Sequence, residues 1–314
     1  MKPFKTYYEQ IKILKSRGMI FSDEPKAIHV LERENYYNLI NGYKDFFIDK
    51  SGTNEKFKEG ATFEDIYALY LFDRELRSLL LRYLLTFETN LKSKISYHFT
   101  EKYSETHSYL EIRNYSKKSK NVLDLVARHF NIIRTQSKQD NAISHYLKKY
   151  EEVPLWVIVN YMSFGHIQYF YTSMKSQERD KVAKDFSQVF KREYDYDTAI
   201  ISPEMLDAVI KTANYFRNVC AHEERLYNFK IRKPAKSGAI SKTLQIDNCL
   251  VDKGNIFAMI SFLKLVSIKT EYLELLEGLE GLFDKYDSLF TTFSFSEARG
   301  EMGFPAEFKD MLSS

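Results

Sequence analysis

Apolar residues recur along this chain at intervals of three and four positions, which is the spacing of amphipathic α-helices. The longest such stretch runs from residue 62 to about residue 100, and its apolar positions are Leu76, Leu79, Leu80, Tyr83, Leu84, Phe87 and Leu91. Because residues at these intervals share one face of a helix, the stretch predicts a single long helix with one buried side. The same spacing predicts shorter helices over residues 4–18, 24–34, 35–47, 121–136, 138–150 and 255 to about 290.

The clearest helix start in the chain is Ser202-Pro203-Glu204. Serine is a good N-cap, proline suits the first helical position, and an acid in the first turn interacts favourably with the helix dipole. The helix that begins here is expected to reach about Asn228, so that it covers residues 203–229. The segment 231–254 fits a small β-hairpin with its turn at Asp247-Asn248.

Residues that interrupt helices are scarce, since the 314 residues include only 11 glycines and 6 prolines. The sequence therefore predicts an all-α fold. We expect a helical N-terminal region over residues 1–60 and a helical core over residues 61–314, packed together as one continuous globular unit.

Cysteines and histidines give no sign of a metal or another cofactor, and we expect none. Cys220 and Cys249 have neither metal-ligand spacing nor the pattern of a disulfide framework, which fits a reducing compartment. Residues 1–19 are rich in lysine and lack the apolar centre of a signal peptide. No apolar run approaches the ~20 residues that span a membrane. These features predict a cytoplasmic protein without a membrane segment.

The net charge of +3 is too small to indicate a nucleic-acid partner, but its distribution along the chain is uneven. Residues 225–242 contain no acid and six basic residues, namely Arg225, Lys230, Arg232, Lys233, Lys236 and Lys242. A second basic run covers residues 113–120, and residues 271–287 are acidic. Such runs are usually solvated faces. The first one, however, follows a segment whose residues could act on RNA.

That segment is Arg217-Asn218-Val219-Cys220-Ala221-His222, in which an arginine and a histidine stand five positions apart. Arginine holds phosphate charge at any ordinary pH, and histidine takes up and releases protons near neutrality. The pair suits cleavage of RNA without a metal, although the spacing alone is a weak signal that occurs by chance.

Helix geometry leaves two questions about this segment open. Arg217 falls within the apolar stripe of its helix, so it is either in a buried ion pair, with Asp73 or Glu88, or directed into a cleft between two copies of the helix. Five positions also separate Arg217 and His222 by about 140° around a helix axis. Either the helix ends or distorts at His222, or two chains pool their groups across a twofold axis.

The residues around this segment resemble the Abi family of bacteriophage abortive-infection proteins, specifically the AbiD/AbiF group. The segment and the Glu224–Asn228 stretch after it look like the family's signature. Other blocks resemble the family in the same order along the chain, namely residues 2–18, 35–43, 73–77 with Glu88, 154–156 with 163–165, and 302–305.

The resemblance implies a helical domain like that of HEPN proteins, with extra N-terminal and C-terminal helices. Many HEPN proteins are metal-independent endoribonucleases that act as toxins or phage-defence effectors, and some members of the Abi group pair with a small noncoding RNA. Carried over to this chain, Arg217 and His222 would be catalytic, Asn218 and Glu88 would support them, and Arg77 would contact RNA.

We therefore expect an endoribonuclease that is a homodimer through the motif helix and leaves a 2′,3′-cyclic phosphate. Arg225, Lys230, Arg232 and Lys233 would hold its RNA. The main alternative is a non-catalytic RNA-binding or phage-sensing protein on the same fold, in which Arg217 is structural. Nucleotidyl transfer is a weaker alternative, because the chain has no glycine-rich or paired-aspartate motif to support it.

Overall fold

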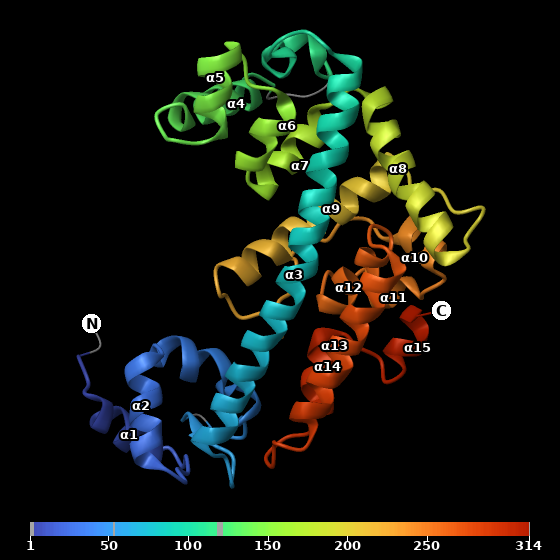
Figure 1. Cartoon of the computed structure of the whole chain (residues 1–314). Helices are drawn as coiled ribbons and strands as arrows, with labels where there is room; N and C mark the ends of the chain where they lie inside the picture. The colour runs from blue at the N-terminus through green and yellow to red at the C-terminus, as the bar shows by residue number, and fades with distance from the viewer. Residues whose placement is uncertain (1–2, 53, 118–121, 314) are drawn as a thin grey trace. The chain divides into compact units, whose positions relative to one another are not determined.

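The computed structural model describes residues 3–52, 54–117 and 122–313, and the chain in these ranges is mainly helical (Figure 1). The predicted all-α fold is confirmed, while its relation to HEPN domains stays a prediction. The α-helices in chain order are α1 (Tyr7–Ser16), α2 (Glu24–Arg33), α3 (Phe63–Lys102), α4 (Val122–Gln136), α5 (Ala142–Tyr150), α6 (Leu155–Ile158), α7 (Phe164–Ser173), α8 (Ser176–Tyr194), α9 (Pro203–Ala221), α10 (Gly238–Leu244), α11 (Asn248–Val251), α12 (Ile256–Lys264), α13 (Lys269–Asp287), α14 (Phe295–Met302) and α15 (Phe308–Ser313).

Short helical turns and one small sheet complete the described structure. The turns are the π-helical η1 (Tyr37–Asn41) and the 3₁₀ turns η2 (Lys44–Phe46), η3 (Ser108–Leu110), η4 (Ile112–Asn114) and η5 (Val159–Tyr161). Strands β1 (Ile48–Asp49) and β2 (Lys56–Phe57) pair antiparallel, with Ile48 opposite Phe57. Each strand has two residues, which is too short for an alternating pattern to reveal it in the sequence.

The long helix predicted from residue 62 is confirmed as α3, whose 40 residues follow one uninterrupted apolar pattern. The helix predicted over residues 35–47 is broken into η1 and η2, and the one predicted from residue 255 is divided into α12 and α13. Residue 121, the first of another predicted helix, lies outside the described residues. Helix α8 was not predicted at all, although its buried residues Val182, Phe186 and Phe190 recur at intervals of four.

The hairpin predicted within residues 231–254 is wrong, because the segment forms α10 and α11 instead. Gln245 adopts a left-handed backbone conformation with φ of 55° and ends α10. The side chain of Asp247 then accepts a hydrogen bond from the backbone N–H of Cys249 at 2.9 Å and caps α11. Asp247-Asn248 is thus a helix start rather than a hairpin turn.

The chain divides into two compact units. Unit 1 comprises Met1–Leu80, Val219–Phe229 and Glu274–Ser314, and unit 2 comprises Leu81–Asn218 and Lys230–Leu273. The predicted region 1–60 is therefore part of unit 1, which also takes in later segments, and the boundary expected at residue 60 does not coincide with a boundary of these units. That expected division stays a prediction.

The core of unit 1 is rich in aromatic rings that connect α3 with the C-terminal helices. Phe72 of α3 contacts Phe295 of α14 edge to face at a centroid distance of 4.9 Å, and Phe283 of α13 contacts the same ring. Gly278 lets α13 approach α3 closely, since a Cβ atom there would lie 3.0 Å from Leu79. Edge-to-face rings at these distances add to the stability that burial alone provides.

The core of unit 2 contains a stacked pair of histidines. His129 of α4 and His166 of α7 are both buried, and their rings stack at a centroid distance of 4.9 Å. His129 also packs against Phe170 at 5.0 Å. Burial lowers the pKa of His129 to about 3 and that of His166 to about 4, because the apolar surroundings disfavour the charged ring.

No helix in the ranges that the structure describes is both long enough and apolar enough to cross a membrane.

The buried histidine pair predicts a loss of stability in mild acid. Below pH 6.5 the unfolded chain binds protons that the folded chain does not, so the free energy of unfolding falls as pH drops from about 6.5 towards about 4. At pH 5 we expect a loss of about 2 kcal/mol for each histidine. Urea unfolding at several pH values measures this slope.

The variant His129→Phe keeps a ring in the core but removes one titrating group, so its acid slope should be about half as steep. His145→Phe, which changes an exposed histidine of α5, is the matched control and should keep the wild-type slope. An unchanged slope in His129→Phe would contradict this explanation.

Candidate functional site

Arg217 lies near the end of α9 and belongs to unit 2, where it pairs with Glu88 of α3. Its Nε atom donates to Glu88 Oε2 at 3.4 Å. The Glu88 side chain is only 6% exposed, whereas that of Arg217 is 25% exposed. Of the two partners considered from the sequence, Glu88 is thus confirmed and Asp73 is wrong. Asp73 pairs with a different arginine.

Glu88 holds two cations at once. Its second oxygen, Oε1, accepts a hydrogen bond from Lys92 Nζ at 2.7 Å, one helical turn further along α3. Among the described residues, the terminal nitrogens of Arg217 have no hydrogen-bond partner, because its contact with Glu88 uses Nε. A guanidinium held in this way keeps its two terminal nitrogens available for the oxygens of a phosphate.

Asn218 is exposed and begins a chain of side-chain amides along α9. Its Nδ2 donates to Asn214 Oδ1 at 3.5 Å, and Asn214 Nδ2 donates to Gln168 Oε1 of α7 at 2.8 Å. This chain lies within unit 2. The predicted support of His222 by Asn218 stays a prediction, whereas the bond to Asn214 is a contact that the sequence did not suggest.

Helix α9 ends at Ala221, so the prediction that it reaches about Asn228 is wrong. Glu223 adopts a left-handed conformation with φ of 54°, and its N–H donates to Cys220 O at 3.4 Å. The N–H of Glu224 donates to Val219 O at 3.0 Å, which completes the hydrogen-bond pattern of a Schellman cap. His222 is the first residue after the helix, so the helix does end there, while the pooling of groups from two chains stays a prediction.

His222 is exposed and lines a polar cavity of about 500 Å³ in unit 1. The cavity also has walls from η1, from the start of α3 and from the residues after α9. Its side chains with binding potential are Tyr37, Asn38, Asn41, Arg77, His222 and Arg225. The histidine, the two arginines and the amides are groups that contact a phosphodiester and an attached base, and three glutamates, Glu34, Glu223 and Glu224, share the same lining.

A buried carboxylate fixes the chain that follows His222. Asp73 of α3 accepts hydrogen bonds from the backbone N–H groups of Leu226 at 3.0 Å and Tyr227 at 2.6 Å. It also accepts a hydrogen bond from Tyr43 Oη at 2.7 Å and forms an ion pair with Arg77 one turn along α3. Burial raises the pKa of Asp73, while Arg77 and the two N–H groups oppose that shift.

Arg77 and Arg225, two of the five predicted RNA contacts, both line the cavity, but each has protein partners there. Arg77 is 5% exposed and donates to Tyr43 Oη and to Glu224 O, each at 3.2 Å. Arg225 donates to the carbonyl of Gly42 and forms an ion pair with Asp45 at 3.3 Å. Their first role in the fold is to hold the walls of the cavity together.

The other predicted RNA contacts, Lys230, Arg232 and Lys233, are exposed and belong to unit 2. The basic run 225–242 is therefore divided between the two units. In the second basic run, Lys118 and Lys120 lie outside the described residues.

Sequence reasoning missed the residues that η1 contributes to the cavity. Tyr37 is 71% exposed, and Asn38 and Asn41 lie one turn apart beside it. The tyrosine-rich block at 35–43 was visible as part of a predicted helix and of the family resemblance, but its residues were not singled out as a binding surface. An exposed tyrosine beside two asparagines was the signal that could have found them, since stacking and amide hydrogen bonds are how single-stranded bases are held.

The motif cysteine has no chemical role that the structure supports. Cys220 is buried, and burial raises the pKa of its thiol to about 12. Across the described ranges, histidine, cysteine and acidic residues do not gather in groups of three or more that could hold a metal ion.

The fold and the site define an all-α protein whose polar cavity adjoins a segment carrying arginine and histidine. The family model described as Abi-like protein matches residues 29–228, which is more than half of the chain and includes α3, α9 and the residues of the cavity. The chain belongs to this family. Membership suggests a role in abortive infection, a form of defence against phages. Neither the curated proteins nor the solved structures contain a match to it.

The buried carboxylate gives a direct prediction for stability. Asp73→Ala leaves Arg77 buried without its counter-ion and leaves two backbone N–H groups without an acceptor. We expect it to lower the free energy of unfolding by about 3–5 kcal/mol in urea titrations. Tyr43→Phe, which removes one of the donors, should cost about 1 kcal/mol.

The matched control is Asp45→Ala, because Asp45 is an aspartate whose side chain is 54% exposed in its ion pair with Arg225. It should change the free energy of unfolding by less than about 1 kcal/mol. If Asp73→Ala were as stable as this control, the network would not be holding the segment after α9.

Proposed function

We propose that this protein is a metal-independent endoribonuclease of the HEPN type that acts in abortive infection, as a toxin to RNA of the infected cell. The observation that carries the proposal is that His222, exposed at the end of α9, lines a polar cavity with two arginines. Arg217, in the same six-residue segment, has terminal nitrogens without a protein partner among the described residues.

In the proposed reaction the ribose 2′-oxygen attacks the adjacent phosphorus. A bond forms between the 2′-oxygen and phosphorus, the bond from phosphorus to the 5′-oxygen breaks, and the products are a 2′,3′-cyclic phosphate and a 5′-hydroxyl. His222 takes the proton from the 2′-hydroxyl or gives one to the leaving oxygen. Arg217 stabilises the negative charge on the phosphoryl oxygens, and Glu88 orients its guanidinium through Nε.

The reaction needs both a base and an acid, while the segment supplies one histidine per chain. A homodimer in which two motif segments meet would supply two. This is the physical reason for proposing that the active form is a dimer with a composite site. A small noncoding RNA bound to the basic residues of either unit would restrain such a toxin, with Lys230, Arg232 and Lys233 among its contacts in unit 2.

The ion pair of Arg217 with the buried Glu88 also favours a second candidate function. In that alternative the pair is purely structural, and the protein binds RNA or senses a phage component without cleaving RNA. The two candidates differ in whether RNA is cleaved.

An RNA cleavage assay distinguishes the two candidate functions directly. Purified protein is incubated with end-labelled RNA in EDTA, beside Arg217→Ala and His222→Ala. We expect wild type to cut and each variant to lose at least about 100-fold in rate while keeping its affinity for RNA. Circular dichroism verifies that the variants are folded. Matched controls are Arg113→Ala and His145→Ala, both exposed and remote in sequence from the motif, and both should cut normally.

The mechanism has its own test within the same assay. A single 2′-deoxyribose at the cleaved position removes the attacking oxygen, so cutting there should stop while neighbouring positions are cut as before. Continued cutting at the deoxy position would rule out attack by the 2′-hydroxyl. RNA bound with equal affinity and left intact by wild type would favour the binding function.

Mixing of active and inactive chains tests the composite site. Wild-type chains and chains with both Arg217→Ala and His222→Ala, mixed in equal amounts and allowed to exchange, should keep about a quarter of the activity of the same total amount of wild type, because only a quarter of the dimers have both motifs intact. If each chain holds its own site, half of that activity remains. Size-exclusion chromatography with light scattering establishes the oligomeric state of the same samples.

A further inference from the structure

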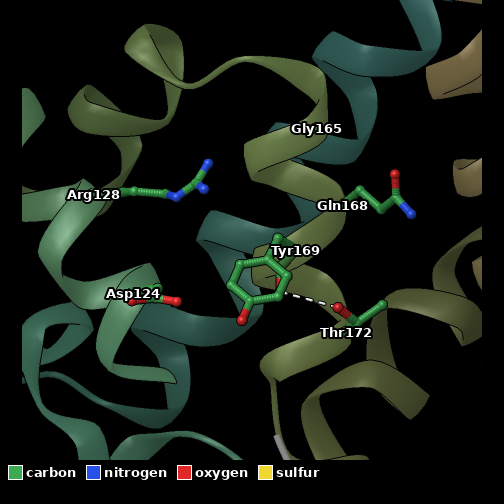
Figure 2. Close-up of a pocket in the computed structure, with 6 residues that line it drawn as sticks. All are labelled: Asp124, Arg128, Gly165, Gln168, Tyr169 and Thr172. Atoms are coloured by element: carbon green, nitrogen blue, oxygen red, sulfur yellow. Dashed lines mark hydrogen bonds between the residues drawn. The ribbon is translucent and has the colours of Figure 1, made fainter. Parts of the chain in front are cut away.

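A second cavity, of about 340 Å³, lies between α4 and α7 in unit 2 and is not part of the site described above. Figure 2 shows the residues that line it, Asp124 and Arg128 from α4 and Gly165, Gln168, Tyr169 and Thr172 from α7. The spacing of four on one helix and of three and four on the other means that each helix presents one continuous face to the cavity. Its size is that of a pocket for one small ligand.

Both charged side chains of this cavity lack protein partners within the described ranges. Arg128 and Asp124 stand one turn apart on α4, yet neither forms an ion pair or a hydrogen bond there. In Figure 2 the guanidinium of Arg128 extends from α4 towards α7, and Asp124 lies separately beside the ring of Tyr169. An unpaired cation and an unpaired anion in one cavity can bind a ligand that carries both an anionic group and hydrogen-bond donors.

Tyr169 adds an independent observation that points to a ligand. Its hydroxyl oxygen is shielded from solvent and has no hydrogen-bond partner among the described residues. Buried polar groups in folded proteins are nearly always hydrogen-bonded, and an exception needs a physical explanation. Tyr169 lines the cavity, and a ligand bound there would supply this partner once the ring turns its hydroxyl towards it.

The cavity is connected to the motif helix by hydrogen bonds within unit 2. Gln168 Oε1 accepts from Asn214 Nδ2 at 2.8 Å, and Asn214 Oδ1 accepts from Asn218 Nδ2 at 3.5 Å. Gly165 also lines the cavity, and a Cβ atom at this position would make an ordinary contact with Asn214 at 3.6 Å.

We propose that this cavity binds one nucleotide of a single-stranded RNA. Arg128 holds its phosphate, the ring of Tyr169 contacts its base, and Asp124 accepts hydrogen bonds from N–H groups on the edge of that base. The subsite therefore prefers guanine, which offers two adjacent N–H donors, over uracil, whose edge offers one. The inference rests on the proposed function for the identity of the polymer, but it concerns residues that the proposed chemistry does not use.

Binding to RNA tests the subsite without any need for cleavage. All proteins carry Arg217→Ala and His222→Ala, so that the RNA stays intact, and a fluorescent single-stranded RNA of ten nucleotides is titrated by anisotropy. Adding Arg128→Ala should raise Kd about tenfold and reduce the slope of log Kd against log salt by about one. Tyr169→Ala, which removes the ring that would contact the base, should weaken binding as well.

Arg134→Ala is the matched control, because it removes a positive charge from an exposed part of the same helix outside the cavity. It should change Kd less than twofold. Asp124→Asn should bring the Kd for guanosine-containing RNA closer to the Kd for uridine-only RNA. The proposal is overturned if Arg128→Ala and Tyr169→Ala, both shown to be folded by circular dichroism, bind RNA as the parent does.

Titration with free nucleotides distinguishes a cavity that binds a nucleotide within RNA from one that binds a free nucleotide. If GMP binds the parent protein with a Kd that depends on Arg128 while RNA binding does not, the cavity is a site for a free nucleotide and the RNA proposal is overturned. Cleavage is scored separately in chains with an intact motif. Loss of RNA affinity in Arg128→Ala without cleavage by any chain would support the subsite and contradict the nuclease.

Discussion

The carboxylate of Asp73 is the interaction on which the end of the motif segment depends. It is fully buried, and it accepts hydrogen bonds from a tyrosine, an arginine and two backbone N–H groups. A charge in that position is stable only with all of these donors in place. Because Leu226 and Tyr227 are bound to it, the short stretch from His222 to Arg225 has a fixed start, at the end of α9, and a fixed end, on α3.

Much of this arrangement could be predicted where the signal is local. The spacing of apolar residues predicts α3, and Ser202-Pro203 predicts the start of α9, because each signal lies in residues that are close together in the sequence. The cost of leaving an arginine unpaired in an apolar stripe indicated an ion pair for Arg217, but it did not choose between Asp73, Glu88 and a cleft between two copies. The end of α9 was missed because Glu223 takes the left-handed position that glycine usually marks. The bonds from Asp73 join residues 153 and 154 positions apart, and no local pattern encodes them.

The candidate site shows the same division between local and distant information. Arg217 and His222 were found because they lie in one short segment, and their chemical roles remain a proposal. Tyr37, Asn38 and the cavity between α4 and α7 were not found, because each residue is unremarkable in the sequence and gains its meaning from neighbours on another helix. The failed hairpin at residues 231–254 has a different cause, since Asp247 is as good a helix cap as it is a turn former.

The burial of Cys220 has a consequence for how this protein can be observed. A thiol with a pKa near 12 is almost entirely neutral at physiological pH, and neutral thiols react slowly with alkylating agents and oxidants. Cys249, the other cysteine, is exposed. The chain thus contains a protected thiol at the next-to-last residue of α9 and an accessible thiol, Cys249, as an internal reference. The rate at which thiol reagents modify Cys220 therefore measures how often that end of the helix opens transiently.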